Sequence, residues 1–166
     1  MKLIIGSIVV LSLVVLFLFA LFPADISVTR IVQVSSPKAT VEKKIRDLRE
    51  WKSWNELVMN PPPREITNTT NERGVDSDFI DLGGLHINRL KSAADTVFTI
   101  WRHGNDSFAG NFNLTEAGNQ TIVEWTLHFH VKWYPWEKLA SMFYDKQLGP
   151  QMEKSLLNLQ KELNPN

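Results

Sequence analysis

The chain contains no cysteine and carries no net charge, and both features exclude classes of function. Without cysteine in its 166 residues, it can form no disulfide bond, thiol nucleophile or cysteine-ligated metal site. Lys and Arg number 18, as do Asp and Glu, so the chain lacks the basic excess typical of nucleic-acid-binding proteins. Internal repeats and low-complexity tracts are also missing. The length then favours one domain with a short appendage, and we expect no nucleic-acid partner.

One long apolar run is present, at residues 3–22, and it contains neither charge nor proline. As a helix it would extend about 30 Å, enough to span a bilayer. We therefore predict a transmembrane anchor at residues 1–24 and a domain at 25–166. A cleaved signal peptide and a buried core helix are the alternatives, but the run exceeds a usual signal h-region and no A-x-A-like site follows. Lys2 before the run and Asp25 after it favour a single-pass membrane protein with its domain on the extracytoplasmic side.

The rest of the chain reads as a strand, a helix and then a series of strands. Apolar residues alternate over 26–34, and a helical pattern follows Pro37 over 38–49. Turn residues then separate six further strands, which we place at 64–69, 75–82, 85–92, 96–103, 107–115 and 120–132. Such short connections favour an antiparallel meander.

Two helical stripes of apolar residues lie near the C-terminus, over 136–143 and 148–163. On one straight helix these stripes would face nearly opposite sides. Gly149-Pro150 lies between them, and this pair combines a common helix end with a favoured first helical residue. We therefore predict that the helix direction changes at Gly149-Pro150.

This order of elements, with the segments "SSPKATVEKKIRDLREWKSWN" and "PWEKLASMFYDKQLGPQMEKSLLNLQKEL", resembles the START-like (SRPBCC) superfamily. The nearest group is the polyketide cyclase/dehydrase and lipid-transport family, in its membrane-anchored bacterial members. The resemblance covers about residues 25–163. It implies an α+β helix-grip fold, in which a curved antiparallel sheet wraps around C-terminal helices and encloses a hydrophobic cavity. Members bind lipids, sterols or polyketides, and no catalytic residue set is common to them.

The strand at 120–132 alternates most strictly, so its apolar side chains project together toward the terminal helices. We predict that this face borders an apolar cavity that the terminal helices close. The expected lining residues are Trp54, Trp101, Val123, Trp125, Leu127, Phe129, Leu139 and Phe143. Packing of the same side chains directly on the helices, without a cavity, is the alternative.

Polar residues offer few candidates for chemistry. Arg30 and Arg102 share strand faces with apolar residues, so each needs a partner, either a ligand headgroup or an acidic side chain. His128 and His130 share a strand face, but no third zinc ligand lies near them, and we expect a solvated outer face rather than a metal site. The carboxylates at positions 76, 78 and 81 are expected at a solvated strand edge.

The sequence thus favours a membrane-anchored protein that binds a hydrophobic small molecule or lipid, without catalysis and without a cofactor. A cyclase- or hydrolase-like enzyme acting on an apolar substrate is one alternative, but it would need inward-facing acid and base groups. A scaffold whose cavity is filled by its own aromatic side chains is the other.

Overall fold

The computed structural model describes residues 2–21, 23–59, 63–67, 78–90, 93 and 95–164. Parts of the strands expected at 64–69, 75–82 and 85–92, and the Asp76 carboxylate, lie outside these described residues.

Within these described residues, seven strands form one antiparallel sheet in the order β1-β7-β6-β5-β4-β3-β2. Each strand after β2 pairs with its neighbour in the sequence, which confirms the predicted meander, while β1 pairs with β7. The strands are β1 (Asp25–Val34), β2 (Glu65–Thr67), β3 (Phe79–Asp81), β4 (Leu85–Arg89), β5 (Thr96–His103), β6 (Asp106–Ala117) and β7 (Gln120–His130).

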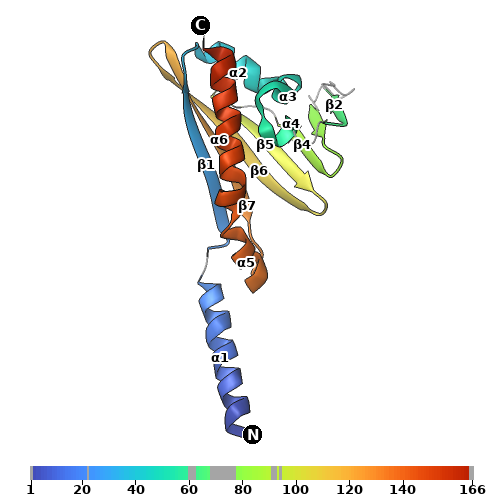
Figure 1. Ribbon diagram of the computed structural model, residues 1–166, viewed down its shortest axis with the longest axis vertical. Coiled ribbons are helices and arrows are strands. Elements are labelled where there is room, and N and C mark those ends of the chain that lie inside the picture. Colours follow the sequence, from blue (N-terminus) through green and yellow to red (C-terminus); the bar gives the residue numbers. More distant parts are fainter. Residues whose placement is uncertain are drawn as a thin grey trace.

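Helices cover one face of this sheet. Figure 1 shows α6 running lengthwise along it, with the shorter α2, α3 and α4 grouped toward its C-terminal end. The arrangement is the α+β helix-grip architecture that the sequence predicted. The helices of the domain are α2 (Lys38–Arg46), the 3-10 turn η1 (Leu48–Glu50), α3 (Trp51–Trp54), α4 (Glu56–Met59), α5 (Pro135–Ser141) and α6 (Tyr144–Leu163).

The two faces of the sheet differ because side chains alternate along each strand. Val28 lies opposite Leu127 in the register of β1 and β7, and Phe112 lies opposite Trp125 in that of β6 and β7. These residues belong to the buried core together with residues of α6. We call the face that carries them the inner face, and the opposite face the outer face.

Helix α1 (Lys2–Ala20) extends away from the sheet, contacts α5 and leaves most of its apolar side chains exposed (Figure 1). Within the described ranges, no helix combines the length and the hydropathy that crossing a membrane requires. The predicted transmembrane segment at 3–22, and with it the single-pass membrane localisation, is therefore wrong. The helix ends at Ala20, before the end of the predicted span.

The predicted change of helix direction at Gly149-Pro150 is also wrong in its position. The break lies at residues 142–143, between α5 and α6, and α6 continues through Pro150. A methyl group on Gly149 would lie 1.9 Å from a guanidinium nitrogen of Arg30 on β1. The glycine thus lets the Arg30 side chain pass close to α6, and it does not end a helix.

Candidate ligand-binding site

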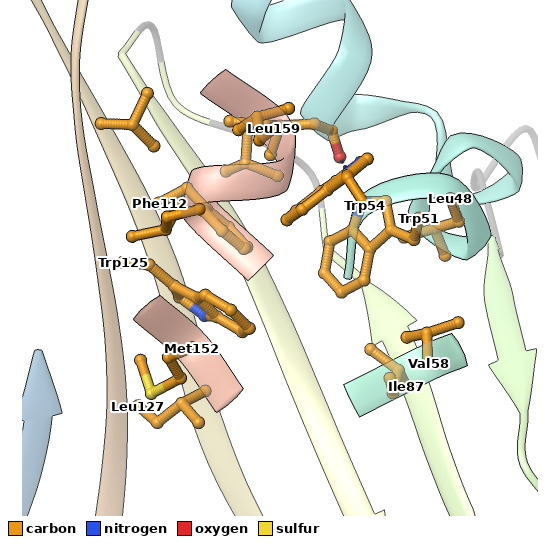
Figure 2. Close-up of a cluster of buried hydrophobic side chains, with 14 of the residues drawn as sticks. Leu48, Trp51, Trp54, Val58, Ile87, Phe112, Trp125, Leu127, Met152 and Leu159 are labelled. Atoms are coloured by element: carbon orange, nitrogen blue, oxygen red, sulfur yellow. Dashed lines mark hydrogen bonds between the residues drawn. The ribbon is translucent and has the colours of Figure 1, made fainter. Parts of the chain in front are cut away.

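Four tryptophans and one phenylalanine belong to the buried core between the inner face and the helices. Figure 2 shows Trp51, Trp54, Phe112 and Trp125 of this group. Each is at most 1% exposed. Phe112 stacks on Trp125 with ring centroids 4.9 Å apart, and Trp54 meets Trp125 edge to face at 6.5 Å. The indoles of Trp51 and Trp101 complete the group, each within 6.5 Å of another member. We call these five residues the aromatic cluster.

Local structure explains why these rings meet. Trp125 and Phe112 are direct cross-strand neighbours on β7 and β6, where facing side chains lie within contact distance. Trp51 and Trp54 are three residues apart on α3, so both point toward one side of that short helix. The cluster therefore joins the middle of the sheet to the helical segment after α2.

Hydrogen bonding divides the four buried indoles into two pairs. Trp51 donates from Nε1 to the carbonyl oxygen of Ile45 at 2.8 Å, and Trp101 donates to Oγ1 of Thr99 at 2.9 Å. Nε1 of Trp54 and of Trp125 have no hydrogen-bond partner among the residues that the structure describes. Nδ2 of the neighbouring Asn55 is likewise buried without a partner in that part of the chain. All three unsatisfied atoms are donors.

The structure brings most of the predicted lining residues together. Five of them are buried on or against the inner face, namely Trp54, Trp101, Val123, Trp125 and Leu127. Their rings and side chains contact one another in one continuous core, which also includes Met152, Leu156 and Leu159 of α6. The second apolar stripe of the C-terminal region therefore covers the inner face.

The first apolar stripe of the C-terminal region, over 136–143, does not cover the inner face. Leu139 is 48% exposed and Phe143 is 52% exposed, so the prediction that these two residues close the cavity is wrong. The helix direction changes just before α6 begins, and this turns the apolar side of α5 away from the sheet. The misplaced break at Gly149-Pro150 is the origin of this error.

Phe129 lies at one end of the inner face, where the core is only partly covered. Its ring is 4.7 Å from that of Phe108 on β6 and 4.9 Å from that of Tyr144 at the start of α6. Partial burial raises the pKa of the Tyr144 hydroxyl. Trp101 stacks on Phe108 at 5.8 Å, so a row of rings connects this partly covered end to the aromatic cluster.

Arg30, a predicted ligand contact, is held by the protein itself. Its guanidinium lies 2.9 Å from Oδ1 of Asp145 and donates to the carbonyl oxygen of Thr29. The hydrogen bond from Arg30 lowers the pKa of the Asp145 carboxyl. The pair, together with the close approach of Gly149, attaches the first half of α6 to β1.

The other polar candidates lie away from the aromatic cluster. Arg102 is on the outer face, where it donates to Oδ1 of Asn88 at 2.9 Å. Asp78 is nearly buried and accepts from Nε of Arg89 at 2.9 Å, so it is paired rather than solvated as expected. Asp81 accepts from the backbone nitrogen of Gly83 in the following turn.

Sequence reasoning missed two aromatic residues of this region, Phe108 and Phe112. A signal for them was present, since Phe108, Gly110, Phe112 and Leu114 alternate along β6. Gly110 is part of the same pattern, because a Cβ there would meet Thr99 at 2.6 Å and the Trp101 indole at 3.0 Å.

No family model matches this sequence. No curated protein matches it either.

Solved structures do resemble the fold. The di-domain aromatase/cyclase StfQ from the steffimycin biosynthetic pathway aligns with a TM-score of 0.64 and 9% identity, over 84% of this chain and 51% of that one. A Streptomyces aromatase/cyclase aligns with a TM-score of 0.60 and 13% identity, over 84% of this chain and 93% of that one. A START superfamily protein from Mycobacterium smegmatis aligns with a TM-score of 0.57 and 18% identity, over 83% of this chain and 99% of that one. The chain thus spans about half of the di-domain protein, and identities this low show the fold alone.

Proposed function

We propose that this protein binds a hydrophobic small molecule, without catalysis, between the inner face of the sheet and helices α3 and α6. The lining residues proposed are Trp54, Trp101, Val123, Trp125, Leu127 and Phe129. The titles of two structural neighbours name aromatase/cyclases. A fold with a curved sheet closed by one long helix is suited to enclose an apolar molecule in this place.

The observation that carries the proposal is the set of unsatisfied donors in the aromatic cluster. A buried donor without an acceptor destabilises a protein by about 1–3 kcal/mol, and Trp54, Asn55 and Trp125 each present one. An oxygen that only accepts hydrogen bonds would satisfy such donors. The ring neighbours of both indoles are aromatic, so a neutral acceptor such as a ketone or an ester fits better than a carboxylate buried without a cation.

Room for the ligand must come from a small movement, because the cluster is closely packed. Helix α3 has four residues and carries both Trp51 and Trp54. A shift of this short helix would open space over Trp125 while α6 stays attached to β1 through Arg30. The row of rings from Trp101 to Tyr144 offers an apolar route inward from the partly covered end.

The test uses prodan, a neutral fluorophore that carries a ketone and shifts its emission to the blue in apolar surroundings. Prodan titrated into the folded full-length chain should show a saturable blue shift. Trp125→Phe, which keeps a ring and removes the indole donor, should weaken binding up to about tenfold, the equivalent of one hydrogen bond.

Trp136→Phe is the matched control, since Trp136 is 66% exposed on α5 and lies outside the proposed site. It should leave the dissociation constant unchanged, even if some prodan adheres to exposed apolar surface. A titration without saturation, or an equal loss in both variants, would contradict the proposed function and support the scaffold alternative.

We also propose that the folding unit begins at residue 25. Strand β1 starts there and pairs along its whole length with β7. Helix α1 lies outside the sheet and its covering helices (Figure 1).

A further inference from the structure

A groove of about 530 Å³ lies across the outer face, on the side of the sheet opposite the aromatic cluster. Four of its lining residues form one row in the sheet register, from Ser27 on β1 through His128 and Ala109 to Ile100 on β5. Side chains alternate along a strand, so His128 points away from the face that carries Leu127. The groove is therefore separate from the site proposed above.

The shape of the groove follows from side-chain size along this row. Ser27 and Ala109 are small, whereas His128 and Ile100 beside them are larger. Phe108 and Phe129 also border the groove, although their rings lie on the inner face, where Phe129 meets Tyr144 of α6. Most of the lining surface of the groove is apolar. The volume of the groove and its mostly apolar lining both suit a small aromatic molecule that lies flat across the strands.

Asp25, two serines and two imidazoles supply the polar part of the lining, and the hydrogen-bond partners of the imidazoles indicate which ring nitrogen carries hydrogen. Nε2 of His128 lies 2.8 Å from Oδ1 of Asn111, and an amide oxygen can only accept, so Nε2 donates. Nδ1 of His130 lies 2.8 Å from Oδ1 of Asp25 and donates to that carboxylate in the same way. In the neutral rings, Nδ1 of His128 and Nε2 of His130 can then accept a hydrogen bond, and neither has a partner within the described part of the chain.

From this geometry we infer that the outer groove binds a hydroxylated aromatic molecule, such as a phenol or a naphthol. Its ring covers the apolar floor around Ala109 and Ile100, and its hydroxyl donates to an acceptor nitrogen of His128 or His130. A metal ion is a poorer occupant, because no three His, Cys, Asp or Glu side chains gather as ligands within the described residues.

The test compares 2-naphthol with 2-methoxynaphthalene, which has a similar shape but no donor. Isothermal titration of the full-length chain should show 2-naphthol binding about three- to tenfold more tightly, the value of one hydrogen bond. His128→Phe and His130→Phe keep a flat ring and remove the acceptor nitrogen. At least one of them should abolish the preference for 2-naphthol while the protein remains folded, as judged by its circular dichroism.

His86→Phe is the matched control, because His86 is an exposed histidine beside a carboxylate, Asp81, but does not line the groove. It should leave the preference unchanged. Equal affinity for both probes, or a preference that survives both groove variants, would overturn the inference. Trp125→Phe should not alter 2-naphthol binding, so failure of this site and failure of the inner site are distinguished by different variants.

Discussion

The two faces of this sheet are built from the same strands, yet one is closed and the other is open. On the inner face, Trp101 and Trp125 are at most 1% exposed beneath α3 and α6. On the outer face, Phe98 and Ile31 are 40% and 63% exposed, although they too are apolar strand residues. The amino-acid type therefore does not decide burial in this protein. What decides it is which face the helices cover.

This comparison predicts a large difference in stability between the faces. Trp125→Ala should lower the free energy of unfolding by about 3–5 kcal/mol, because it leaves a large cavity beside Phe112 and Trp54. Phe98→Ala on the outer face should lower it by less than about 1 kcal/mol, since the ring is already partly hydrated. Urea unfolding followed by circular dichroism measures both, and similar losses would show that the outer face is also covered in solution.

Substitution of Gly149 tests how closely α6 packs on the inner side of β1. Gly149→Ala places a methyl group against the guanidinium of Arg30, which must swing aside and lose its ion pair with Asp145, so it should lower the unfolding free energy by about 0.5–1 kcal/mol. The double variant Arg30→Ala/Gly149→Ala should recover part of that loss relative to the sum of the single changes. Strict additivity in chemical unfolding would show that the two residues do not meet.

Substitution of two threonines, one on each face, compares the contribution of their hydrogen bonds to stability. Thr99 is buried, accepts from the Trp101 indole and donates to the carbonyl oxygen of Gly110. Thr99→Val should therefore lower the unfolding free energy by about 1–3 kcal/mol, because it leaves both groups unsatisfied. Thr29 bonds to Thr126 on the outer face, where Thr126 is 5% exposed but Thr29 itself is only partly buried. Thr29→Val removes one hydrogen bond rather than two and should lower the unfolding free energy by about 0.5–1 kcal/mol in the same assay.

The ion pair between Arg30 and Asp145 should give a small dependence of stability on pH. Because the pKa of Asp145 is lower in the folded chain than its ordinary value near 3.8, the pair stabilises the fold above that pH. The contribution is lost as the pH falls through the lowered pKa. Asp145→Asn should thus reduce the amount by which the unfolding free energy falls between about pH 5 and pH 2. An unchanged acid limb would show that the pair is broken in solution.

Removal of α1 should have the smallest effect on the sheet and its two faces. A chain that begins at Asp25 retains β1, its pairing with β7 and the whole aromatic cluster. We expect its thermal midpoint to lie within a few degrees of the full-length value. A truncated chain that no longer unfolds cooperatively would place the domain boundary before residue 25.

Local patterns in the sequence determined the elements of this protein and their order. Alternation over 96–103 and 120–130 predicts strands because side chains of a strand project to two sides with a period of two. Short turns between such strands leave little choice but antiparallel pairing. The helix after Pro37, the meander and the α+β class could all be predicted in this way.

Only the tertiary structure decided which residues face one another across these elements. Arg30 and Arg102 each share a strand face with apolar residues, but Arg30 lies beside α6 and Arg102 lies on the open face. Gly149 resembles a helix end in the sequence, yet it is small because Arg30 lies against it. The turn at residues 142–143 then exposes Leu139 and Phe143 rather than burying them. Each outcome depends on a contact between segments more than a hundred residues apart, or on the placement of a whole helix, and no local pattern encodes such contacts.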